Sequence, residues 1–311
     1  MHFDEAFFAG EEKLGFYIRP IMKRMWSVEM EVLSVIAEIC DKYGIRWFID
    51  SGSLLGTIRH QGFIPWDDDV DISMMRADFN RFLQVAPAEL PDGWRLFNGS
   101  QDQSPTGIIT RVINTETVRI DPEFLSRNHG CPYIMGVDIF VLDAVPDDPE
   151  EDEIFRALLT MAYDVFGKTD NGMMLRDCAP DVKEEVDQLR AALDVDIDSS
   201  LPIKRQILVL ADQIAAIYND TGAENVTIEP FYVNRPEVRI PASCYDETVE
   251  MSFESMIVPV PTGYDTILQT WYGENYMTPV QSNPHPALDE SERRLREYYE
   301  LKGMEFPKEF E

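Results

Sequence analysis

The stretch DSGSLLGTIRHQGFIPWDDDVDI, residues 50–72, places two acidic residues on a strand shortly after a Gly-Ser turn. Asp69 and Asp71 are separated by one apolar residue, and residues two apart on a strand face the same side. Two like charges about 5 Å apart repel by about 3 kcal/mol at an effective dielectric of about 20. A fold tolerates this repulsion best when the pair is solvated or holds a cation. The spacing therefore predicts a divalent metal site.

The aspartate run has two other interpretations. Alternate residues of 67–71 match the first ligand positions of an EF-hand loop, but that loop requires Gly at its sixth position and Glu at its twelfth. Those positions hold Ile72 and Asp78, and a strand is predicted where the glycine turn would stand, so we exclude an EF-hand. A solvated acidic loop remains an alternative, against which the neighbouring Ile64 and Trp66 argue.

The Gly52-Ser53 pair precedes a predicted helix over 53–60, whose first N–H groups are suited to binding a phosphate. Ser53 is equally suited to capping that helix. Arg59 either bonds a phosphate in a bidentate manner or pairs with an aspartate, and His60 serves as an acid or base or anchors the loop by packing. Arg111, in a predicted apolar strand, requires an anionic partner, either a phosphate or an aspartate.

Asp138 is a further acid that requires an explanation. It stands alone in the apolar run GVDIFVL, and a buried aspartate is costly without a partner or a metal. A hydrogen-bonded structural role for Asp138 is one alternative. Asp143 is the alternative candidate to Asp138, although its place before Ala144-Val145-Pro146 suits a turn.

The chain is strongly acidic, with 27 Lys and Arg against 57 Asp and Glu and a formal net charge of -30. This balance excludes sequence-independent nucleic-acid binding and docking on an anionic membrane. The N-terminus MHFDEAFFAGEEK has acids where a signal peptide requires bases, and no apolar run approaches a membrane span. No CxxC pair is present among the four cysteines, so reduced thiols and a cytoplasmic location are expected.

Strands and helices alternate up to about residue 145, which predicts a mixed β-sheet flanked by helices. We therefore expect a catalytic core over 1–145, a mostly helical insertion over 146–245 that shapes the acceptor region, and a C-terminal segment over 246–311 that packs back on the core. Local patterns predict further elements. They are an irregular arm over 1–16, a helix from Met25 to Tyr43 stopped by Gly44, a hairpin of 107–113 with 117–120, a hairpin over 253–260 and a helix over 264–272.

The block GSLLGTIRHQGFIPWDDDVD, residues 52–71, resembles the hallmark block of the LicD family, GTLLGxxRHxGFIPWDDDxD. MGVDIFVLDAVPDD, residues 135–148, looks like the family's DIFPLD segment, with Val141 where Pro is common. PTGYDTILQTWYGENYMTP, residues 261–279, is similar to its C-terminal YG block, which His285 follows. The resemblance covers about residues 20–145 and 250–285.

This resemblance implies a nucleotidyltransferase fold in which the helix after Gly52-Ser53 binds donor phosphates. Three carboxylates, here Asp69, Asp71 and Asp138, would hold Mg²⁺ or Mn²⁺. Characterised relatives move phosphocholine from CDP-choline onto cell-surface glycans, and distant eukaryotic relatives move ribitol phosphate from a CDP donor. The expected partners of this chain are therefore a CDP-activated alcohol and a glycan.

Four aromatic residues are candidates either for a cage around a quaternary ammonium group or for core packing: Trp66, Trp271, Tyr272 and Tyr276. Among these, Trp66 and Tyr272 are expected to contact substrate, together with His60 and His285. Asp138 is a candidate general base for the acceptor hydroxyl. Two alternatives use the same residues: an NTP-dependent nucleotidyltransferase and an inactive nucleotide-binding scaffold.

Overall fold

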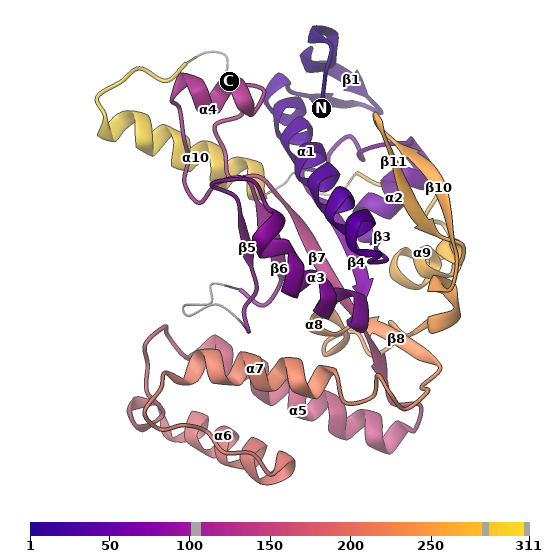
Figure 1. The fold of residues 1–311 in the computed structure, drawn as a ribbon, viewed down its shortest axis with the longest axis vertical. Helices are drawn as coiled ribbons and strands as arrows, with labels where there is room; N and C mark the ends of the chain where they lie inside the picture. The colour runs from indigo at the N-terminus through magenta and orange to yellow at the C-terminus, as the bar shows by residue number, and fades with distance from the viewer. Residues whose placement is uncertain (101–106, 282–285, 308–311) are drawn as a thin grey trace.

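The computed structural model describes residues 1–100, 107–281 and 286–307, in which a mixed β-sheet lies among helices (Figure 1). The sheet has the order β3-β4-β7-β6-β5. Its strands are β3 (Phe48–Ile49), β4 (Val70–Met75), β5 (Arg95–Phe97), β6 (Thr110–Ile113) and β7 (Gly136–Val145). Strands β4 and β7 are parallel, and the other neighbours in this order are antiparallel. This confirms the predicted mixed α/β fold.

The long strand β7 connects two parts of the molecule. Its first residues, 136–139, pair with β6, while its last residues, 142–145, pair with β8 (Asn225–Ile228). Strand β8 in turn pairs with the two-residue strand β9 (Ile240–Pro241). The apolar composition of β7 matches its burial between layers, as expected for a central strand.

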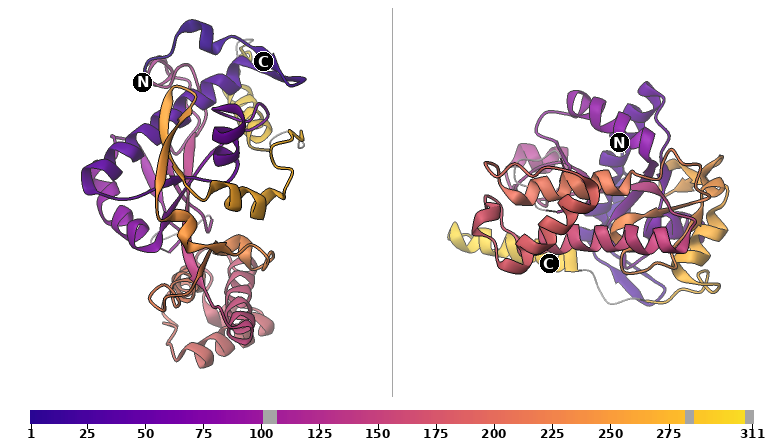
Figure 2. Two further views of the ribbon diagram at one scale, coloured as in Figure 1. Left: turned by 90° about the vertical axis from the view of Figure 1, so that its right-hand side faces the viewer. Right: turned by 90° about the horizontal axis from the view of Figure 1, so that it is seen from below.

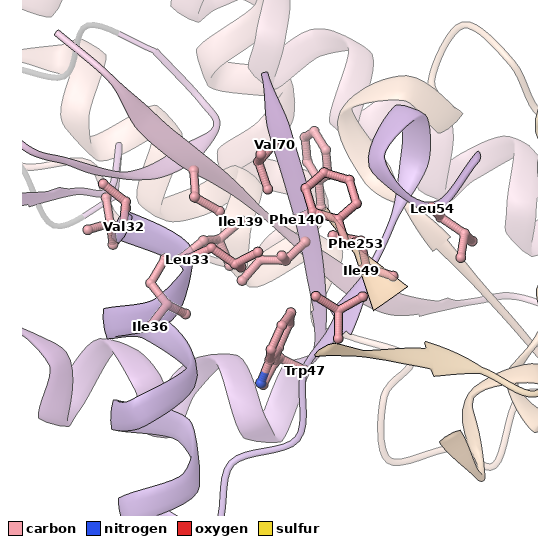
Figure 3. Packing of buried hydrophobic residues seen from close by; sticks show 14 of the residues in the cluster. Val32, Leu33, Ile36, Trp47, Ile49, Leu54, Val70, Ile139, Phe140 and Phe253 are labelled. Atoms are coloured by element: carbon pink, nitrogen blue, oxygen red, sulfur yellow. The ribbon is translucent and has the colours of Figure 1, made fainter. Parts of the chain in front are cut away.

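Helix α1 (Pro20–Tyr43) covers one face of the sheet. Proline at its first turn and Gly44 just after its end, at φ 64°, are favoured helix boundaries, since Gly adopts the left-handed conformation without strain. Figure 3 shows Leu33 and Ile36 of α1 beside Val70 and Ile139 of the sheet, and all four are buried in one hydrophobic cluster. Burying each such side chain contributes about 1.5–3 kcal/mol.

A second hydrophobic cluster joins three helices that lie at one end of the molecule, beyond the sheet (Figures 1 and 2). They are α5 (Pro149–Lys168), α6 (Pro180–Leu193) and α7 (Ile203–Ala215). The sheet cluster and this helical cluster meet near the end of β7, where Val145 packs with the helices. The domain boundaries drawn from the sequence stay a prediction. Among the helices of the described ranges, none has the length and apolar character needed to cross a bilayer.

The C-terminal part returns to the sheet cluster. Strands β10 (Thr248–Phe253) and β11 (Met256–Pro261) form the hairpin expected around 253–260, and α9 (Tyr264–Tyr272) ends at Gly273 as predicted. Phe253 of β10 is buried with the residues of the main core. The last helix, α10 (Pro286–Leu301), contributes Leu295 to the same cluster.

Two local predictions are wrong. Residues 117–120 form no strand, because both edges of β6 are already taken by β5 and β7 and leave no place for a hairpin partner. The arm over 1–16 is more regular than expected. Within it, β1 (Glu11–Lys13) pairs with β2 (Phe16–Ile18) around Leu14 and Gly15, both at positive φ. The remaining helices are α2 (Ser51–His60), α3 (Arg76–Glu89), α4 (Pro122–Arg127) and α8 (Glu229–Tyr232).

Glu229 of α8 makes stability depend on pH. It is 6% exposed and accepts a hydrogen bond from Tyr163 of α5. Burial, reinforced by nearby acids such as Asp143, raises its pKa to about 8. The folded chain therefore holds this proton longer than the unfolded chain, and the stability linked to it is complete below about pH 4 and is lost as the pH rises through 8.

We therefore expect a Glu229→Gln variant to flatten the pH dependence of the free energy of unfolding between pH 5 and 8. The slope contributed by one such group is at most about 1.4 kcal/mol per pH unit. Urea unfolding of both proteins at several pH values measures it. If the difference between variant and wild type stays constant across this range, Glu229 is not the titrating group.

Candidate functional site

Asp71 and Asp138 lie side by side on the two parallel strands at the centre of the sheet. The register of β4 and β7 pairs Asp71 with Asp138 directly. Helix α2 is fixed against this point, because the backbone N–H of Asp71 donates to Oγ of Ser53 over 2.9 Å. The structure thus brings the predicted Gly-Ser turn and two of the three predicted carboxylates together.

Asp71 is the centre of a negative cluster. Its side chain is buried, with 8% exposure for the residue. Burial raises its pKa well above the usual range, and the charges of four neighbouring aspartates raise it further: Asp69, Asp138, Asp67 and Asp50. The groups around the cluster therefore do not fully neutralise its negative charge, and this favours binding of a cation.

Arg111 neutralises one member of this cluster. It lies opposite Asp138 on β6 and donates from Nη2 to Asp138 Oδ2 over 2.7 Å and from Nε to Oδ1, a bidentate pair. The Arg111 side chain is 47% exposed. Of the two partners that the sequence left open for Arg111, the structure supplies the aspartate.

The carboxylates suit a hard divalent cation in their chemistry, since Mg²⁺ and Mn²⁺ prefer oxygen ligands. Asp50 adds a further buried carboxylate near Asp71. Across residues 1–100, 107–281 and 286–307, however, no three acidic, His or Cys side chains converge closely enough to hold a metal. The carboxylate oxygens of Asp69, Asp71 and Asp138 are therefore suitable ligands for such an ion. In this structure Asp138 is bonded to Arg111.

Asp143 lies away from this cluster. It accepts from Arg76 of α3 at both oxygens, over 2.7 Å to Nε and 2.5 Å to Nη2, and from Asn219 over 2.7 Å. Arg76 also bonds Asp212 of α7. Asp143 thus occupies a buried ion-pair network that connects the sheet to the helical part, and the structure brings Asp138, not Asp143, beside Asp71.

The first turn of α2 differs in one respect from the simple phosphate cradle expected. A Cβ atom at Gly52 would lie 2.7 Å from Oδ2 of Asp67, so glycine admits a carboxylate against this helix end. Asp50 caps the helix by accepting from the N–H of Ser51. The oxygen of Ser53 accepts from Asp71, as described above. A donor phosphate at this turn would therefore meet Asp67, a repulsion that a cation between them would offset.

Arg59 and His60 form one unit at the end of α2. Arg59 donates from Nη1 to the carbonyl oxygen of Tyr276 over 2.7 Å and from Nε to Nε2 of His60 over 2.9 Å. Burial, together with the positive charges of Arg59 and Lys13, lowers the pKa of His60 to about 4. His60 is therefore neutral near pH 7 and anchors Arg59.

The residues expected to contact substrate lie in different places in the structure. Tyr272 lies by the acids: burial raises the pKa of its hydroxyl, and the charges of Asp71 and Asp67 raise it further. Trp66 is 4% exposed and packs on Phe16 in the core. His285 lies outside the described residues.

Glu29 of α1 is a site residue that the sequence reasoning missed. It is 1% exposed, and its Oε2 has no hydrogen-bond partner among the described residues. Burial, followed by the charges of Asp69 and Asp68, raises its pKa well above the usual range. A signal was present, because Glu29 interrupts the apolar stripe formed by Met25, Val32 and Ile36 at helical spacing.

Comparison with known proteins places this segment in a family. A profile described as LicD/FKTN/FKRP, nucleotidyltransferase domain, matches residues 44–125. The chain is 31% identical over 130 residues to lipopolysaccharide cholinephosphotransferase LicD of Haemophilus influenzae, covering 42% of this chain and 47% of that protein. It is 36% identical over 59 residues to human ribitol 5-phosphate transferase FKRP, covering 19% of this chain and 12% of FKRP.

The matched segments thus span about half of the bacterial relative and a small part of the human one. The family match over residues 44–125 contains the helix α2 and the strand β4, which contribute to the acidic cluster. Residues 44–125 therefore match the nucleotidyltransferase domain of the LicD family, and the relative from Haemophilus influenzae supports the same assignment.

Proposed function

We propose that the chain is a phosphotransferase that moves a phosphoalcohol, with phosphocholine as the first candidate, from a CDP-activated donor to a glycan hydroxyl. The observation that carries the proposal is the pairing of Asp71 with Asp138 on adjacent parallel strands behind the start of α2. The relatives named as cholinephosphate and ribitol 5-phosphate transferases support the class of reaction.

The proposed reaction is an in-line displacement at the phosphorus that carries the alcohol. The acceptor oxygen forms a new P–O bond, the bond to CMP breaks, and CMP leaves with the electron pair. The acceptor proton passes to a carboxylate of the cluster. Asp138, whose two oxygens accept hydrogen bonds from Arg111, becomes available for this role when Arg111 moves away.

Asp69 and Asp71, with Asp138, are the residues that would hold Mg²⁺ or Mn²⁺. Such an ion neutralises diphosphate charge and stabilises the leaving nucleotide. Arg59, held by His60 and by the backbone of Tyr276, supplies positive charge at the end of α2. Tyr272, whose hydroxyl lies within the field of Asp71 and Asp67, is the aromatic side chain proposed to contact the donor.

A donor screen with Mn²⁺ present tests the function. CDP-choline, CDP-ethanolamine, CDP-ribitol and the common NTPs are compared by thermal shift, and products on a panel of glycans are identified by mass spectrometry. A donor at 100 times its Kd should add about 2.7 kcal/mol of stability. Stabilisation by NTPs with NMP transfer would instead favour a nucleotidyltransferase, and no response to Mn²⁺ or any nucleotide would favour a scaffold.

A further inference from the structure

A cavity of about 240 Å³ lies beside the acidic cluster, and Glu29 and Arg111 both line it. Asp68 and Asp69 contribute to the same wall. Glu29 is buried, and its Oε2 is a polar atom with no hydrogen-bond partner in the part of the chain that the structure describes. A buried carboxylate oxygen without a hydrogen-bond partner destabilises the folded chain. A later hydrogen bond or ion pair to Glu29 would remove this cost.

Arg111 has room to change partners. It also lines a second cavity of about 440 Å³, together with Asp138 and Ile134. Its side chain therefore lies between two cavities, and it is 47% exposed even while it donates two hydrogen bonds to Asp138. Its charge already acts on Glu29 across the smaller cavity.

A divalent cation and the Arg111 guanidinium would compete for the same carboxylate. Asp138 cannot serve both well, since two positive charges that share one carboxylate repel each other. Resting on the proposed function, we propose that Glu29 is a positioning residue that receives Arg111 when the cation binds, so that Asp138 is freed to join Asp69 and Asp71. The same movement gives the orphaned Oε2 of Glu29 a partner.

Binding of Mn²⁺ by four proteins tests this exchange, with free Mn²⁺ measured by electron paramagnetic resonance. They are wild type, Glu29→Gln, Arg111→Gln and the double variant. Glu29→Gln removes the second partner and should weaken Mn²⁺ binding about 10-fold, a coupling usual for residues in contact. In the Arg111→Gln background, where Asp138 is already free, the same change should alter the affinity less than about 2-fold.

Arg111→Gln alone should bind Mn²⁺ at least as tightly as wild type, which keeps the test valid if Glu29→Gln fails to fold. A matched control is Glu229→Gln, a buried glutamate of α8 that bonds Tyr163 and is not part of the acidic cluster, which should leave Mn²⁺ binding within about 2-fold. An equal effect of Glu29→Gln in both backgrounds, or no effect in wild type, overturns the exchange alone. Weaker Mn²⁺ binding by Arg111→Gln than by wild type also overturns the exchange alone. A wild type that binds no Mn²⁺ overturns the proposed function as well.

Discussion

An Asp71→Asn variant is expected to lose phosphoalcohol transfer by more than about 100-fold, while the ligand-free chain becomes more stable to heat. The loss follows from the place of Asp71 at the centre of the acidic cluster, where asparagine supplies no charge to a cation. The gain in stability follows from the same charge, because burial and four neighbouring aspartates disfavour its ionised form. The backbone bond from residue 71 to Ser53 is retained.

Steady-state transfer assays and thermal unfolding of the same preparations measure the two effects. Asp78→Asn is the matched control. Asp78 lies in α3, the helix that follows β4, and accepts a hydrogen bond from the backbone N–H of Arg46 at the surface. It should keep transfer within about 2-fold and gain no stability. Transfer by Asp71→Asn at a rate near that of wild type would remove Asp71 from the mechanism, whatever its stability.

The parts of this site that lie close in the chain were predictable from the sequence. The Gly-Ser turn, the helix to His60 and the strand with Asp71 follow from local periodicity and from turn residues within one short stretch. Asp138 was also predictable, because one acid in an apolar strand signals a required partner. The sequence could not decide between Asp138 and Asp143, since that choice depends on which residue the sheet register places opposite Asp71.

The parts that depend on tertiary packing were not predictable in the same way. Arg111 and Asp138 are 27 residues apart and meet only because β6 and β7 pair in antiparallel register. Residues 117–120 have strand-like composition, yet β6, the strand before them, is already paired on both sides by β5 and β7. To predict Glu29 as a site residue, one would have needed both the apolar stripe of α1 and the position of that helix over the acidic cluster. Local pattern gives the elements, and the pairing of distant strands decides which side chains meet.

Removing the buried acid of the Arg76 network is expected to cost about 3–5 kcal/mol of unfolding free energy in an Asp143→Asn variant. Arg76 is 9% exposed and Asp143 is 1% exposed, so the substitution leaves a guanidinium charge without its principal partner away from water. Chemical denaturation followed by circular dichroism measures this cost. Unfolding is expected to begin where β7 passes from the sheet to the helical part, because Asp143 and Asn219 connect them there.

Asp212→Asn provides the comparison on the same arginine. Asp212 also bonds Arg76, over 2.6 Å, but its side chain is 43% exposed, and water replaces an exposed partner at a cost of about 1 kcal/mol or less. The difference between the two variants therefore measures burial with the chemistry held constant. Equal costs would show that Asp143 contributes no more than a surface ion pair. A larger cost at Asp143 would mean that the acid at this position serves stability. Asp138 would then be the third carboxylate of the site.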